Sequence, residues 1–144
     1  MQIPAPVLNL IETEANKAFP KEVCGFLVGI NGGKNILNAI PAPNLSLEPD
    51  QFLIDPKFHL KTQRELRDQG LSIIGCYHSH PLGDSEPSPM DKEGVSTPGF
   101  YWLITSVRGK NRPKTALFRE IVPENSSSSR DFANVHLQIE KFVA

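Results

Sequence analysis

Cysteine and long apolar runs are scarce in this chain of 144 residues, which contains two cysteines in all. The longest apolar stretches, residues 71–77 and 100–105, are far shorter than the roughly 20 residues that a membrane helix needs. Cys24 and Cys76 are too few for a disulfide framework, and each lies in an apolar stretch where a buried thiol is expected. The sequence therefore predicts neither a membrane helix nor a disulfide-stabilised scaffold.

An excess of either charge is also missing. The 15 Lys and Arg residues balance 16 Asp and Glu residues for a net charge of -1, so no positive field is expected to attract nucleic acid or an anionic membrane. Residues 1–13 have no basic segment before their apolar residues, and two prolines interrupt them, so no secretory signal is expected. We therefore expect a cytoplasmic protein. The length is typical of one globular domain.

Two segments have the pattern of a helix. Apolar residues recur every three or four positions over residues 7–19, and a proline ends the pattern. A second helix is expected over residues 55–69, because Asp-Pro suits its start and Gly70 suits its end. His59 falls in this helix and is expected to be exposed.

Several short apolar runs are typical of strands. Asn-Gly-Gly at residues 31–33 predicts a tight turn between the first two runs, and the prolines that begin at Pro41 predict a loop after them. Strands mixed with helices predict an α/β or α+β domain with a mixed central β-sheet flanked by helices. The candidate strands are residues 23–30, 35–40, 52–54, 71–77, 100–107 and 115–122.

The end of the chain is less regular. We expect residues 1–122 to form the core and residues 123–144 to form a flexible Ser-rich connection and a C-terminal element of the same domain. The apolar residues of that element fit either a strand or a short helix.

The sequence around His78 and His80 carries the strongest indication of chemistry. Side chains alternate along a strand, so both imidazoles are expected to point to one side at the end of a buried strand. Asp91 follows a loop rich in glycine and proline that allows the chain to fold back toward them. Two neutral imidazoles, one carboxylate and a water suit an open, catalytic zinc site.

Each of these residues also has a simpler interpretation. The histidines could be polar residues where a strand leaves the core, and Glu22 could be a surface residue ahead of a strand. Ser88 could serve in a turn between two prolines, and Asp91 could be an acidic residue that a helix N-terminus favours. Taken together, however, these simpler interpretations require several independent coincidences.

The spacing resembles that of the JAMM (JAB/MPN) zinc metalloproteases. His78-x-His80, seven residues, Ser88, two residues and Asp91 matches their H-x-H-x7-S-x2-D signature, and Glu22 matches their upstream glutamate. The segments 52–56, 75–81 and 101–106 look like those of small bacterial members, and the resemblance covers roughly residues 4–122. It implies the MPN/JAMM fold, which is cytidine-deaminase-like.

The resemblance also implies roles for these residues. His78, His80 and Asp91 would bind Zn²⁺, Glu22 would act as general base and acid, and Ser88 would donate a hydrogen bond to the oxyanion. The implied activity is hydrolysis of a peptide or isopeptide bond after the C-terminal glycine of a ubiquitin-like or sulfur-carrier protein ending in Gly-Gly. The alternatives are a non-catalytic MPN-type binding module, which usually lacks the metal ligands, and a JAMM peptidase with another peptide substrate. A homodimer is left open.

Overall fold

The computed structural model describes residues 1–48, 51–89, 91, 99–107, 113–121 and 131–140. Its helices are α1 (Ala5–Ala18) and α2 (Pro56–Asp68). Its strands are β1 (Gln2–Pro4), β2 (Cys24–Gly29), β3 (Asn38–Ala42), β4 (Ser72–His80), β5 (Tyr101–Ser106), β6 (Lys114–Ile121), β7 (Asp131–Val135) and β8 (Gln138–Glu140). In the part of the chain that is described, no helix is long and apolar enough to span a bilayer.

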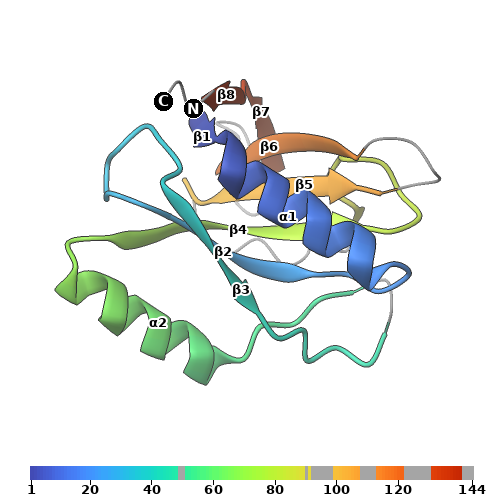
Figure 1. Ribbon diagram of the computed structural model, residues 1–144, viewed down its shortest axis with the longest axis horizontal. Helices are drawn as coiled ribbons and strands as arrows, with labels where there is room; N and C mark the ends of the chain where they lie inside the picture. The colour runs from blue at the N-terminus through green and yellow to red at the C-terminus, as the bar shows by residue number, and fades with distance from the viewer. Residues whose placement is uncertain (49–50, 90, 92–98, 108–112, 122–130, 141–144) are drawn as a thin grey trace.

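Six strands form a mixed central sheet in the order β3-β2-β4-β5-β6-β7, with α1 lying across it (Figure 1). Strands β4 and β5 are parallel, whereas the other neighbours in this sheet are antiparallel. The predicted mixed sheet flanked by helices is therefore confirmed. A separate pair is formed by β1 and β8, which are parallel to each other.

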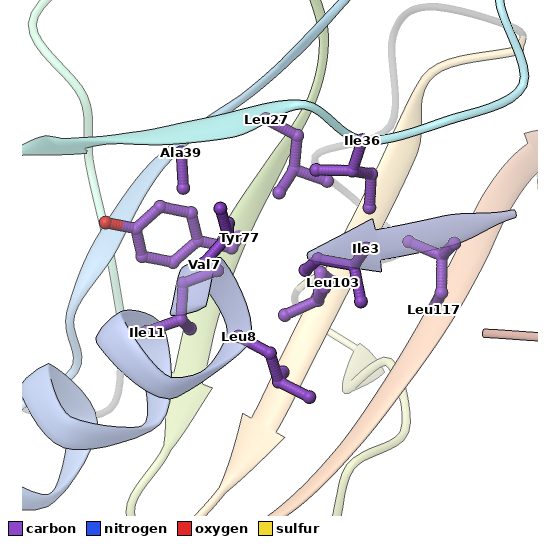
Figure 2. Packing of buried hydrophobic residues seen from close by; sticks show 10 residues of the cluster. All are labelled: Ile3, Val7, Leu8, Ile11, Leu27, Ile36, Ala39, Tyr77, Leu103 and Leu117. Carbon is purple, nitrogen blue, oxygen red and sulfur yellow. The ribbon is translucent and has the colours of Figure 1, made fainter. Parts of the chain in front are cut away.

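The main hydrophobic core lies between α1 and one face of the sheet. Figure 2 shows Val7, Leu8 and Ile11 of α1 beside Tyr77 of β4 and Leu103 of β5. These apolar side chains leave water together, at roughly 25 cal/mol for each square ångström of apolar surface that is buried. Helix α1 confirms the first predicted helix, and its apolar stripe faces the sheet as the pattern predicts.

The opposite face of the sheet carries a second, aromatic cluster. Cys76 of β4, Trp102 of β5 and Phe118 of β6 are buried there. Helix α2 packs on the same face, where Phe58 and His59 contact the ring of Phe26. The expected exposure of His59 is therefore wrong, because this ring is partly buried against β2.

Helix α2 has both of its predicted ends. The Asp55 side chain accepts a hydrogen bond from the Lys57 amide, and Gly70 adopts a positive φ of 74° just after the helix. Without a Cβ, glycine adopts this left-handed conformation at little cost. The helix therefore ends where β4 has to begin.

Two local predictions need correction, and one strand was not predicted. Residues 52–54 do not form a strand, because the side chain of Asn44 takes the backbone hydrogen bonds on both sides of Phe52. Pro41 lies within β3 and not in a loop, which is possible because β3 is an edge strand and needs no hydrogen bond from every residue. Met1 to Pro4 was not predicted to contain a strand, yet it holds β1.

The C-terminal part of the chain contains strands. Strand β7 pairs with β6 at the edge of the main sheet, and β8 pairs with β1. This answers the choice between strand and helix for residues 131–140. The predicted Ser-rich connection lies outside the described residues, and so does most of the predicted turn at residues 108–113.

Candidate metal centre

Strand β4 brings two imidazoles together at its C-terminal end. His78 and His80 are two residues apart, so their side chains leave the same face of the sheet. Their Nε2 atoms lie 3.0 Å from each other. The ring of His78 is fully buried, whereas that of His80 keeps 11% of its surface exposed. One imidazole therefore lies inside the protein and the other faces the opening of the site.

Asp91 brings a carboxylate oxygen to the same point. Its Oδ2 lies 3.2 Å from Nε2 of His78 and 3.0 Å from Nε2 of His80. Ser88 fixes the carboxylate, because its backbone amide donates to Oδ2 across 2.8 Å while its Oγ accepts from the Asp91 amide across 3.0 Å. This reciprocal pair resembles a capping box at the helical residues 89 and 91.

The hydrogen bonds of His80 make these three atoms suitable for a cation. Its Nδ1 lies 2.7 Å from the carbonyl oxygen of Asp84, which can only accept, so Nδ1 carries the proton. In the neutral imidazole, Nε2 then presents a lone pair toward the carboxylate of Asp91 and toward His78. Atoms that are each about 2.0–2.2 Å from one zinc ion have this mutual spacing. Two nitrogens and one oxygen therefore fit a metal ion with an open fourth position.

Aromatic packing holds the ring of His78. The ring of Phe52 stacks on it at 4.4 Å between centroids, and Trp102 meets it edge-on at 5.6 Å. Its Nδ1 is buried without a hydrogen-bond partner among the described residues. Packing therefore orients the ring of His78, whereas a backbone carbonyl orients His80.

The protonation equilibria favour a neutral ligand at the buried end and a charged carboxylate beside it. Burial lowers the pKa of His78 below its ordinary value. Burial alone would raise the pKa of Asp91, but its hydrogen bonds with both histidines hold that pKa well below the usual range. For His80, burial is opposed by the hydrogen bonds to Asp91 and Asp84, and its pKa is raised. The centre therefore attracts positive charge.

Glu22 lies beside His80, in the segment that leads into β2. Its side chain is 6% exposed, and its charge is one of the influences that raise the pKa of His80. Ser79 holds this segment in place: its Oγ accepts from the Val23 amide across 2.9 Å, and its own amide donates to the Val23 carbonyl across 3.1 Å. Ser79, which lies between the two histidines, therefore positions the Glu22 segment from the opposite face of β4.

Asn44 connects the same segment to the loop that carries Phe52. Its Nδ2 donates to the Glu22 carbonyl across 3.1 Å and to the Gln51 carbonyl across 3.0 Å. Its Oδ1 accepts from the amide of Leu53 across 2.9 Å. Asn44 therefore holds the backbone on both sides of Phe52, whose ring then lies on His78.

The structure brings the predicted site residues to one place. His78, His80 and Asp91 converge, Ser88 bonds to Asp91, and Glu22 lies near His80. Sequence reasoning missed the supporting residues Ser79, Asn44, Phe52 and Trp102. Alternation along β4 could have indicated Ser79, but the contacts of the others depend on how distant segments pack.

Residues 4–120 match the family described as prokaryotic homologs of the JAB domain, and the chain belongs to this family. It is 36% identical over 92 residues to a desampylase of Haloferax volcanii, covering 63% of this chain and 66% of that protein. It is 27% identical over 117 residues to a CysO-cysteine peptidase of Mycobacterium tuberculosis, covering 81% of this chain and 80% of that protein.

A solved structure has the same architecture. The solution structure of a protein from Desulfitobacterium hafniense matches with a TM-score of 0.78 and 26% identity, over 98% of this chain and 95% of that one. Together with the family match, this confirms the expected JAB/MPN fold.

Proposed function

We propose that this protein is a zinc-dependent peptidase or isopeptidase. The observation that carries the proposal is the convergence of Nε2 of His78, Nε2 of His80 and Oδ2 of Asp91 within 3.2 Å of one another. These three atoms would hold the ion and leave one position for water or substrate. When bound, zinc supplies a Lewis acid and lowers the pKa of a coordinated water to about 7.

Glu22 carries the proton in the proposed reaction. Its carboxylate accepts a proton from the attacking water and gives it to the nitrogen of the leaving amine. The water oxygen becomes bonded to the carbonyl carbon, and the bond between that carbon and the nitrogen breaks. The products are a carboxylate on the acyl side and a free amine on the other. The position of Glu22 beside His80 supports this role.

Ser88 stabilises the oxygen that becomes negative during the attack. Its Oγ accepts a hydrogen bond from the Asp91 amide, so the hydroxyl proton of Ser88 remains to be donated toward the substrate. A single donor of this kind contributes on the order of 10²-fold to the rate.

The substrate we propose is a ubiquitin-like or sulfur-carrier protein, cleaved after its C-terminal glycine. Two observations support it: the relatives are named desampylase and CysO-cysteine peptidase, and the loop after β4 lies close over the site. The Asp84 carbonyl of that loop contacts His80, and the Ser106 hydroxyl donates to the Gly83 carbonyl across 2.6 Å. A tail of two glycines passes such a loop more easily than larger residues do. A cytoplasmic location and a homodimer stay predictions.

The test is to incubate the zinc-loaded protein with carriers of its own organism that bear an extension after Gly-Gly and to weigh the products. We expect cleavage at the glycine carbonyl, and no cleavage after a chelator has removed the metal. Cleavage only at unrelated positions, or none in any carrier, would contradict the proposed substrate class.

A further inference from the structure

An apolar cavity of about 400 Å³ adjoins the metal centre on the same face of the sheet. Cys76 lines it and lies two residues before His78 on β4, so both side chains leave the same face. Phe52 and Trp102, which contact the ring of His78, also line it, and so does the ligand Asp91. The cavity and the metal centre therefore share walls.

Aromatic rings dominate these walls. Phe26 from β2, Phe52, Phe100 and Trp102 all face the cavity. Trp102 is fixed by a hydrogen bond from its Nε1 to Oε1 of Glu120 across 2.7 Å, so the indole ring is not free to turn and fill the space. A volume in this range and a largely apolar lining are typical of a pocket for a small organic group.

The apolar walls are unfavourable for an anion. Three phenylalanine rings, the indole of Trp102 and the side chains of Leu53 and Ile54 line the cavity, and these carbon surfaces cannot replace the hydration of a carboxylate. Burial of an acidic side chain among them would therefore cost free energy. An apolar side chain has no such cost and gains free energy by leaving water.

The proposed function limits what can occupy the cavity. On the acyl side of the scissile bond the substrate presents glycines, which have no side chain to fill a pocket. The first side chain available beside the metal therefore belongs to the residue on the amine side. We propose that this cavity binds an apolar side chain of that leaving residue and so selects which extension is removed. This inference rests on the proposed function.

The first experiment compares leaving residues. One carrier is made with Gly-Gly followed by Phe, Leu, Ser or Asp, with the rest of the extension unchanged, and kcat/KM is measured for each. We expect Phe and Leu to be cleaved roughly tenfold or more efficiently than Ser, with Asp the poorest, as differences in pocket burial usually give. Equal kcat/KM for all four would overturn the inference while the proposed function stands.

A charge placed in the cavity should change this preference. Ile54 lines it and is partly exposed, so Ile54→Lys is expected to fold and to narrow the preference for Phe over Asp by about tenfold or more. The matched control is Leu60→Lys on α2, where Leu60 is 54% exposed and does not line this cavity. An unchanged preference in folded Ile54→Lys protein, or the same change in Leu60→Lys, would contradict the assignment.

A binding measurement separates the cavity from catalysis. Trp102 is the only tryptophan in the sequence, so the intrinsic indole fluorescence reports on the cavity wall. Phenylalanine amide should give a saturable change that aspartic acid α-amide, which keeps its side-chain carboxylate, does not give, and Ile54→Lys should weaken the response to phenylalanine amide at least several-fold. No response to phenylalanine amide would overturn the inference. If the protein cleaved no carrier but its fluorescence still responded to phenylalanine amide, the cavity would bind apolar side chains as proposed, and the proposed function would be the part that is wrong.

Discussion

The side chain of Asn44 donates a hydrogen bond to the backbone carbonyl of Glu22 across 3.1 Å. The other three hydrogen-bonding positions of this amide are also used, by Ser46, Gln51 and Leu53. One side chain thus joins the proposed proton carrier to the loop that places Phe52 on His78. A change at Asn44 is therefore expected to affect the proposed reaction without altering a proposed metal ligand.

Asn44→Ala should reduce both stability and turnover. The substitution leaves two backbone carbonyls and two backbone amides without this partner, and we expect a loss of about 1–3 kcal/mol in the free energy of unfolding. Because the Glu22 segment loosens, kcat should fall by roughly tenfold while zinc remains bound. Urea unfolding, zinc content and steady-state kinetics measure these three quantities.

Ser46→Ala is the control for this prediction. Ser46 bonds to Asn44 through its backbone amide, so loss of its hydroxyl leaves all four contacts of Asn44 in place. It should change kcat very little. Equal kcat values in the two variants would show that Asn44 has no positioning role.

Glu22→Gln should keep zinc and the fold but lose hydrolysis. The amide has the shape of the carboxylate and cannot accept the proton from the attacking water. We expect kcat to fall by about 10²-fold or more, with zinc content and circular dichroism unchanged. Full activity would contradict the proposed mechanism, and loss of zinc would indicate that Glu22 is itself a ligand.

Ser88→Ala should lower kcat on the order of 10²-fold and retain most of the zinc. The backbone amide of Ser88 still donates to Oδ2 of Asp91 in this variant, so the carboxylate keeps its hydrogen bond to Ser88, and only the bond from the Asp91 amide to the hydroxyl is lost. Ser88→Thr restores a hydroxyl and should recover much of the rate. If alanine and threonine gave the same kcat, the hydroxyl would have no part in the reaction.

Away from the metal, Tyr77 donates a hydrogen bond from its hydroxyl to Oε2 of Glu14 across 3.3 Å, linking β4 to α1. Tyr77→Phe should lower the free energy of unfolding by about 1 kcal/mol. After Glu14→Gln, the same substitution should cost measurably less, because the two residues share one interaction. Strictly additive losses in a double-mutant cycle would mean that this contact contributes nothing.

The parts of the site that follow from local pattern could be predicted from the sequence. Alternation along a strand places His78 and His80 on one face, and the Ser88 to Asp91 spacing suits a reciprocal cap at a helix start. Both depend on residues only a few positions apart. The end of α2 just before Gly70 was predictable for the same reason.

The remaining contacts depend on segments far apart in the chain. The pairing of β1 with β8 joins residues 2–4 to residues 138–140, and no local pattern indicates it. Residues 52–54 have the composition of a strand, yet Asn44 takes the neighbouring backbone hydrogen bonds and Phe52 packs on His78. A side chain from another segment therefore overrides the local preference.

The zinc content of the purified protein tests the central claim most directly. Elemental analysis should find about one zinc per chain in the wild type, and strongly reduced zinc in His78→Ala, His80→Ala and Asp91→Ala. His136→Ala is the matched control, because the His136 side chain is exposed and lies outside the metal centre, so its zinc content should equal that of the wild type. The same zinc content in all five proteins would contradict the assignment of the metal centre.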